Sequence, residues 1–466
     1  MRSPAANADS RLSLWRRVRE YAVPPSMIEA ATARRLVGDW AGACAAARVD
    51  VDLDLRAVVH RHGRDLAARI RADLRHLAPD LLRWHMPRIA PDGLLRPGLT
   101  ISLARYGPAD HADAEPVHLV ARTPPAWADA GQRIGLALWT GSRAGRDCAH
   151  PHPRPDRRFR LDLHRHLWDV RRADELRIRS GARRDVSDTD HPMRADPTWD
   201  ALGQGGYAVR QWAREAALLL QVEGGASGAV TVRLSPRRRL LLDLAPAGTD
   251  PRPPTAHIVG APRAGRVAGL PVLPHAATWM TPDVELLQRG LIEADRLHPL
   301  VASALAPDHP TVGTPASPHQ KASPHLVRCR GAWHRIGLVN GVLTPLDHDP
   351  AEVHREGLLV ALTGTPLPCL QAIDEACRRP ESLPDIRARL DHGDTAGALA
   401  AVEALLGPDA LLPDGKLRQE LDNAALRRIT FGLFRAGLTG RGPGTSVRDW
   451  QPKRARRSHP RHAIPR

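Results

Sequence analysis

Lysine, phenylalanine and tyrosine are scarce in this chain. Its 466 residues include only three of each, beside 11 tryptophans. RNA-recognition sheets stack bases on paired phenylalanine and tyrosine side chains, so the composition argues against a sheet of that kind. Arginine carries almost all of the basic charge.

Paired cysteines and long apolar runs are missing as well. The five cysteines are scattered and form no C-x-x-C pair, which excludes the usual signatures of a disulfide framework or a four-thiolate zinc site. No apolar run approaches the roughly 18 to 20 residues that cross a bilayer, and the first ten residues lack the apolar centre of a signal peptide. We therefore expect a cytoplasmic protein with reduced thiols and no transmembrane segment.

The common catalytic motifs are also missing. The sequence contains no G-x-S-x-G elbow, no H-E-x-x-H pair and no dinucleotide-binding glycine pattern. The glycine-rich residues 437–444 lack the preceding strand and the Lys-Ser/Thr ending of a phosphate-binding loop. Nothing in the sequence demands an enzyme, and a non-catalytic protein without a cofactor is favoured.

What the chain does contain is typical of a folded protein. Hydrophobic residues make up 42% and charged residues 25%, close to the averages of globular proteins. The length suffices for two or three domains. The 43 prolines gather in a few stretches and predict extended connectors between folded blocks.

The period of the apolar residues predicts an α+β protein. Helical spacing dominates residues 1–95, where residues 55–77 form one amphipathic helix that bends near Gly63. Short alternating runs at 99–103, 117–121, 134–138 and 159–163 predict four antiparallel strands. The expected organisation is a helical region at 1–95, an antiparallel sheet with covering helices and proline-rich loops at 96–306, a linker at 307–324, a β-hairpin with a helical bundle at 325–438, and a disordered basic tail at 439–466.

The last folded block carries the strongest local signal. Residues 334–339 and 342–346 flank Asn340-Gly341, which predicts a hairpin with a type I′ turn because that turn needs positive φ at both central residues. Residues 326–330 can add a third strand. Helices are expected at 350–362, 370–378, 385–390, 395–406 and 416–436.

One segment occurs twice. The nine residues from Gly38 match the nine from Gly393 at seven positions, and Arg-Leu stands before each copy. Both copies predict a helix, a tight turn and a second helix, and such hairpins recur in helical scaffolds that bind proteins. Two distant copies do not make a solenoid, so a generic alanine-rich hairpin explains them as well.

Basic side chains suggest a nucleic-acid interface. The net charge is +16, of which residues 441–466 contribute +7. A basic face of the helix at 55–77 and the tail could neutralise phosphates, although a solubilising tail explains the same charge. The candidate residues are Arg56, Arg64, Arg71, Arg75, Lys453, Arg454, Arg456 and Arg457.

A cysteine and four histidines suggest a zinc site. Their nitrogen and sulfur atoms would converge if a hairpin brought the two short segments together, although the spacing matches no zinc-finger pattern and a solvated loop is the simpler explanation. The candidate ligands are Cys148, His150, His152, His164 and His166.

Three functions remain open. The favoured one is a non-catalytic interaction or regulatory scaffold with a protein partner. The second is a nucleic-acid-binding protein, which predicts steep salt dependence. The third is a metal-dependent hydrolase that uses the Cys148 to His166 cluster. The sequence gives neither the partner nor the oligomeric state.

Overall fold

The computed structural model describes most of the chain, and its fold is mixed α and β as predicted. The described residues are 4–107, 116–141, 150–181, 202–203, 205–225, 227–235, 238–244, 256–258, 269–307, 325–339, 342–363, 367–378, 382–407 and 411–438. The predicted tail at 439–466 and nearly all of the predicted linker therefore lie outside them. Among the described residues, no helix is both long and apolar enough to cross a membrane.

The chain divides into two compact units. The larger unit comprises Met1–Asp129, Arg133–Gly313 and Phe434–Arg466, and the smaller unit comprises Ala130–Gln132 and Thr314–Leu433. The helical region predicted at 1–95 and the sheet predicted at 96–306 both fall in the larger unit, where they share one hydrophobic core.

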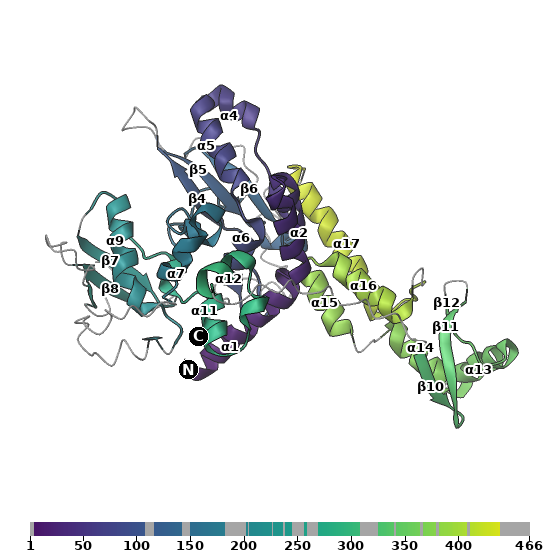
Figure 1. Cartoon of the computed structure of the whole chain (residues 1–466). Helices are drawn as coiled ribbons and strands as arrows, with labels where there is room; N and C mark the ends of the chain where they lie inside the picture. The colour runs from purple at the N-terminus through teal and green to yellow at the C-terminus, as the bar shows by residue number, and fades with distance from the viewer. Residues whose placement is uncertain are drawn as a thin grey trace, which may run out of the picture. The chain divides into compact units, whose positions relative to one another are not determined.

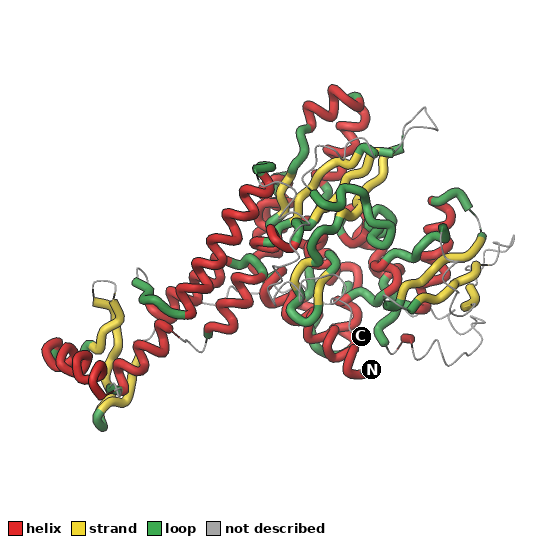
Figure 2. The backbone as a smooth tube through the Cα atoms, turned by 180° about the vertical axis from the view of Figure 1, so that it is seen from behind, coloured by secondary structure: helices red, strands yellow, loops and turns green. Residues whose placement is uncertain are grey.

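The larger unit contains three sheets among its described residues, and helices lie beside them (Figures 1 and 2). Its α-helices are α1 (Pro4–Arg17), α2 (Pro25–Leu36), α3 (Trp40–Ala46), α4 (Leu55–His62), α5 (Arg64–Arg75), α6 (Pro79–His85), α7 (Leu176–Arg179), α9 (Trp212–Val222), α10 (His275–Thr278), α11 (Pro282–Gln288) and α12 (Pro299–Leu305). A π-helix η1 (Val18–Ala22) continues α1. The short 3₁₀ helices are η2 (Ala126–Ala128), η3 (Ala130–Gln132, assigned to the smaller unit), η5 (Arg165–Leu167), η6 (Val170–Glu175), η8 (Val209–Gln211) and η10 (Ala294–Arg296).

The main sheet has the strand order β1-β6-β5-β4. Its strands are β1 (Val49–Val51), β4 (Thr100–Tyr106), β5 (Val117–Arg122) and β6 (Ile134–Trp139). The antiparallel pairing of β4, β5 and β6 confirms three predicted strands, while β1 joins β6 in parallel. A second sheet is formed by β7 (Gly228–Arg233), β8 (Arg239–Leu244) and β9 (Ala256–Ile258), and β2 (Arg88–Ile89) pairs with β3 (Leu94–Leu95).

The fourth predicted strand, residues 159–163, was wrong. Its alternation is real, since Phe159 and Leu161 are buried. The backbone nevertheless closes into turns, because Leu163 N–H donates to Arg160 O and His164 N–H donates to Leu161 O. These local bonds replace a ladder and leave a single bridge between Ser102 and Arg160.

Tryptophan fills much of the larger unit's interior. Trp84 and Trp168 lie in the core that the helices share with the main sheet, and Trp212 packs α9 against β7 and β8. These three are the largest fully buried side chains among the described residues. Their large apolar surfaces compensate for the scarcity of phenylalanine.

The smaller unit contains a three-stranded antiparallel sheet and five α-helices among its described residues. The strands are β10 (His325–Cys329), β11 (Ala332–Val339) and β12 (Val342–Pro345), and the helices are α13 (Pro350–Thr363), α14 (Pro368–Arg378), α15 (Leu383–Asp391), α16 (Thr395–Leu406) and α17 (Lys416–Arg435, whose last two residues belong to the larger unit). All of them agree closely with the predicted ranges. The predicted turn at Asn340-Gly341 lies outside the described residues.

The repeated segment forms the same hairpin twice. Gly38 and Gly393 have φ of 78° and 81°, a left-handed conformation that favours glycine. Asp39 accepts a hydrogen bond from Gly42 N–H at 2.8 Å, and Asp394 accepts one from Gly397 N–H at 3.2 Å. The sequence match therefore reflects one turn and one helix cap.

The cap makes the third residue of α16 intolerant of a side chain. A Cβ at Gly397 would lie 2.1 Å from Asp394 Oδ2, whereas a Cβ at Gly432 in α17 would meet nothing within 4 Å. We expect Gly432→Ala to stabilise the protein by about 0.5–1 kcal/mol, since alanine favours helices. Gly397→Ala must displace the cap, and its free energy of unfolding should fall about 1–2 kcal/mol below that of Gly432→Ala. Hydrogen exchange of peptides from α16 and α17 measures both, and equal protection would contradict the cap.

Candidate functional site

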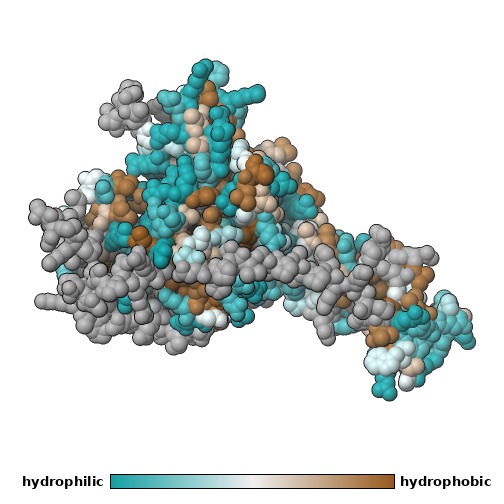
Figure 3. All heavy atoms as spheres, in the orientation of Figure 1, coloured by the Kyte–Doolittle hydropathy of each residue, from teal (hydrophilic) through white to brown (hydrophobic). Residues whose placement is uncertain are grey.

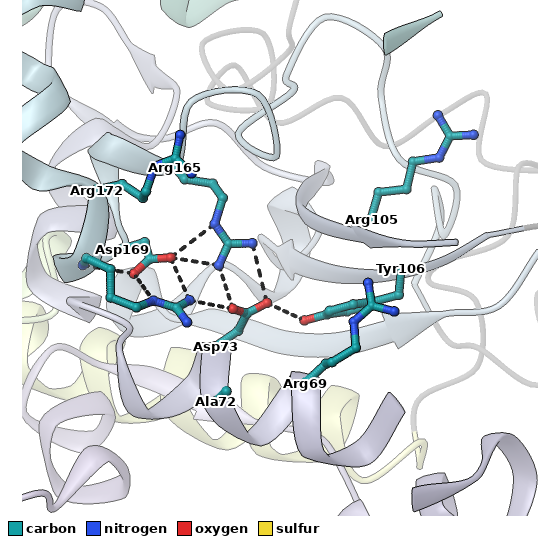
Figure 4. A pocket seen from close by; sticks show the side chains of 9 residues that line it. Arg69, Ala72, Asp73, Arg105, Tyr106, Arg165, Asp169 and Arg172 are labelled. Atoms are coloured by element: carbon teal, nitrogen blue, oxygen red, sulfur yellow. Dashed lines mark hydrogen bonds and ion pairs between the residues drawn. The ribbon is translucent and has the colours of Figure 1, made fainter. Parts of the chain in front are cut away.

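An arginine-rich cavity of about 440 Å³ lies in the larger unit (Figure 4). Helix α5, the end of strand β4 and the segment η5–η6 enclose it. Its lining residues are Arg69, Ala72, Asp73, Arg105, Tyr106, Arg165, Asp169, Arg171 and Arg172. Its size is within the range of small-molecule sites.

Backbone hydrogen bonds hold η5 and η6 against the end of α5. Ala78 N–H donates to Trp168 O at 2.8 Å, and Val170 N–H donates to His76 O at 2.9 Å. These two bonds flank a bridge between Leu77 and Asp169. The cavity walls are therefore fixed by main chain as well as by side chains.

Two buried carboxylates organise the floor of the cavity. Arg171 Nη2 donates to Asp73 Oδ1 at 2.6 Å and to Asp169 Oδ2 at 2.8 Å. Arg165 bridges the same pair, with Nη2 2.7 Å from Asp169 Oδ2 and 2.5 Å from Asp73 Oδ1. Asp169 also caps η6 by accepting from the Arg171 backbone N–H. Each arginine thus cross-links α5 to the η5–η6 segment.

Tyr106 completes this network. Its hydroxyl donates to Asp73 Oδ2 at 2.7 Å. Burial and the adjacent Asp73 carboxylate raise the pKa of Tyr106, so the phenol stays protonated and keeps donating. Burial disfavours the charged form of Asp169. Hydrogen bonds from Arg171 and Arg165 outweigh the effect of burial, so they lower the pKa of Asp169. Both carboxylates are therefore satisfied by the protein itself.

The remaining arginines leave the cavity positively charged. Five arginines and two aspartates line it, and the Glu175 carboxylate beside Arg172 reduces the excess to two positive charges. Arg69 lies over the Tyr106 ring with its Cζ atom 5.2 Å from the ring centroid, and Arg172 pairs with Glu175 outside the lining. Arg105 is exposed and makes no ion pair with a described residue. In Figure 4 its guanidinium points away from the carboxylates.

Sequence analysis missed these residues. One signal was present, because Asp73 falls on the apolar stripe of α5 beside Ile70 and Leu74, where a charged side chain needs partners. The partners Arg165 and Arg171 lie more than 90 positions away and have no local signature.

The predicted basic face is exposed, but it does not line the cavity. The helix expected at 55–77 is broken at Gly63, whose φ is 87°, into α4 and α5. The four candidate arginines of these helices are all exposed, and none of them lines the cavity. They are Arg56, Arg64, Arg71 and Arg75. The arginine of α5 that lines the cavity is Arg69. The surface of α4 and α5 is mostly hydrophilic (Figure 3). The tail candidates Lys453, Arg454, Arg456 and Arg457 lie outside the described residues.

The first half of the predicted zinc cluster is partly described. Cys148 lies outside the described residues. His150 is buried, its Nε2 donates to Thr123 O at 2.9 Å, and its Nδ1 accepts from the His152 backbone N–H. His152 is exposed. Both ring nitrogens of His150 are thus occupied within the protein.

The second half of that cluster is buried among other partners. His164 Nε2 lies 3.1 Å from Glu215 Oε2, and its ring centroid is 5.8 Å from that of His166. Among the described residues, the one group of three or more gathered metal-capable side chains contains none of the four predicted histidines. Zinc at this cluster stays a prediction.

The geometry can be compared with known proteins. No family model, curated protein or solved structure matches this chain. A cavity whose carboxylates are already paired and whose remaining charge is positive suits an anion, and guanidinium groups bind phosphate oxygens in pairs.

Proposed function

We propose that this protein binds nucleic acid without catalysing a reaction, and that the arginine-rich cavity holds a backbone phosphate. The two lining arginines that pair with no described carboxylate, Arg69 and Arg105, carry the proposal. Arg105 supports it most directly, because its exposed guanidinium pairs with no described carboxylate and can turn both of its NH₂ groups to a phosphate.

The buried network has a separate part in this proposal. Arg165 and Arg171 already donate to Asp73 and Asp169, so they hold the cavity open and contribute positive potential. Arg69 and Arg105 are left to contact the ligand. This division resembles other anion sites, in which fixed dipoles and charges are arranged before the ligand arrives.

Neighbouring phosphates would meet the exposed arginines. Arg64, Arg71 and Arg75 repeat at helical spacing along α5, on a different side of the helix from Arg69. One strand of nucleic acid could therefore contact the cavity and this stripe across the exposed side of α5. The basic tail would add contacts that do not depend on sequence.

Binding of a mixed-sequence oligonucleotide at several salt concentrations tests the proposal. We expect Arg69→Ala and Arg105→Ala each to weaken binding several-fold and to reduce the slope of log K against log salt by about one, since each removes one phosphate contact. Arg214→Ala is the matched control, because Arg214 is an exposed arginine of α9 that does not line the cavity.

The controls separate the cavity from the tail. A version of the protein that ends at Leu438 should keep the effect of Arg105→Ala while losing affinity uniformly. Binding that is abolished by this truncation and insensitive to Arg69 and Arg105 would reject the cavity as the site. Absence of binding by the full chain at low salt would reject the function.

A specific observation supports the scaffold function as a second candidate. Leu36 and Val37, at the tip of the first hairpin, are 78% and 80% exposed, which is unusual for large apolar side chains in adjacent positions. We propose that a protein partner covers this tip. Purification of the protein with its partners from its own cells, compared with Val37→Asp, tests this candidate: the same partners on both versions would reject it.

A further inference from the structure

Two cysteines and a histidine come together in the smaller unit. Cys329, His348 and Cys369 each present a ligand atom, and these three atoms all lie within 4.8 Å of one another. This is the one such group of three or more among the described residues. The cluster is independent of the arginine-rich cavity and of the function proposed for it.

Local structure places each of the three residues. Cys329 ends β10 at a two-residue turn, in which Arg330 and Gly331 have φ of 51° and 87°, as a type I′ turn requires. His348 lies in the loop between β12 and α13. Cys369 is the second residue of α14. Three separate elements therefore supply one site. The spacing of these residues in the sequence does not predict that they come together.

Burial makes the cluster unusual. Both cysteines have no exposed surface, and the His348 side chain is only 4% exposed. His348 Nδ1 lies 3.7 Å from Glu352 Oε2, while its Nε2 is buried without a hydrogen-bond partner. A carboxylate on one ring nitrogen is the usual companion of a histidine whose other nitrogen binds a metal.

A second histidine adjoins the first. The rings of His334 and His348 are stacked, with centroids 4.2 Å apart, and His334 Nδ1 is also buried without a partner. Leaving two neighbouring buried nitrogens unsatisfied costs free energy unless something fills the gap. A cation among the three gathered ligand atoms would satisfy His348 Nε2 and use the thiols, and His334, which is not part of that group, could reach the ion by turning its ring.

Two simpler explanations compete with a metal. Cys329 and Cys369 could be small core residues, since they pack with Leu367, or they could form a disulfide. The first leaves the histidine nitrogens unexplained. A disulfide would likewise leave the buried His348 Nε2 without a partner.

We propose that Cys329, His348 and Cys369 bind one Zn²⁺ ion, and that the ring of His334 turns toward the ion to supply the fourth ligand. Two thiolates and two imidazoles are a common tetrahedral set for structural zinc. Binding forms four bonds to the metal and releases the two thiol protons to solvent. The ion joins β10, β11 and α14, and we infer that it stabilises the fold of the smaller unit.

Metal content of the full-length protein, purified without a histidine tag, tests the proposal. We expect about one zinc per chain, falling below about a tenth in Cys329→Ser, Cys369→Ser and His348→Gln. His334→Gln should lose zinc as well. Cys44→Ser and His354→Ala are matched controls, because Cys44 is buried in the larger unit and is not one of the clustered residues, and His354 is exposed on α13.

Cobalt replacement gives a second readout that does not depend on how well a variant folds. The wild-type protein loaded with Co²⁺ should show the visible bands of tetrahedral coordination and the near-ultraviolet band of thiolate ligation. A chelator should abolish both and should speed hydrogen exchange in β10 and α14.

Three results would overturn the proposal. The first is wild-type protein that lacks stoichiometric zinc and also fails to take up Zn²⁺ or Co²⁺ after reduction. The second is an intact Cys329–Cys369 disulfide, detected by mass spectrometry under native conditions. The third is zinc that stays bound in all three variants. Retention of zinc by His334→Gln alone would overturn the assignment of the fourth ligand.

Discussion

The larger unit is expected to unfold as the pH falls from about 6.5 toward 4. Three buried histidines are held neutral there. Burial lowers the pKa of His85 and of His150 to about 4, and it lowers the pKa of His166 well below the ordinary value. The unfolded chain takes up these protons near pH 6.5 and the folded chain does not, so stability is lost as the pH falls through this interval.

The expected effect is large. Each proton bound only by the unfolded state changes the free energy of unfolding by about 1.4 kcal/mol per pH unit, so three histidines give about 4 kcal/mol per pH unit. That loss exhausts a typical stability of about 5–15 kcal/mol within the interval. Urea midpoints between pH 7.5 and 4.5 measure it.

A histidine variant measures how much one titrating side chain contributes to the pH dependence of stability. His85→Gln removes a group that titrates only in the unfolded state, so the slope of stability against pH should fall by about 1.4 kcal/mol per pH unit. The comparison uses slopes, which makes it independent of any constant loss of stability that the substitution causes. A flat stability profile between pH 7 and 5 would show that these histidines are protonated in the folded protein.

Asp169→Asn is expected to destabilise the larger unit by about 2–4 kcal/mol at pH 7. Breaking a buried ion pair typically costs about 3–5 kcal/mol, because the partner is left charged and unpaired. The Asp169 side chain is 1% exposed, but Arg165 and Arg171 are 23% and 39% exposed, so water recovers part of that cost. Chemical denaturation provides the measurement.

Asp174→Asn is the matched control for this prediction. Asp174 lies in η6, the 3₁₀ helix that Asp169 caps, is exposed, and should change stability by less than about 0.5 kcal/mol. Because the pKa of Asp169 is lowered in the folded state, its contribution is present above the unfolded pKa near 4 and is lost as the pH falls further. Equal stability of the two variants would mean that Arg165 and Arg171 find other partners.

The sequence alone determined the features that depend on neighbouring residues. The two glycine-aspartate hairpins, the strands on either side of Asn340 and the five helices of the smaller unit were all predicted from turn residues, caps and periodicity. These signals act within a few positions. The reason is that a left-handed glycine or an N-cap aspartate forms its hydrogen bonds within the same turn.

Only the tertiary structure decided which distant residues meet. The alternation at 159–163 predicts a strand, although the backbone there forms turns. No residue near Val49 predicts its parallel pairing with Ile134. Both candidate sites depend on such distant contacts. Asp73 binds Arg171, which lies 98 positions away, and Cys329 lies near His348 and Cys369, which belong to other elements. A side chain's charge or ligand atom is readable from the sequence, but its partner is chosen by the packing of the whole core.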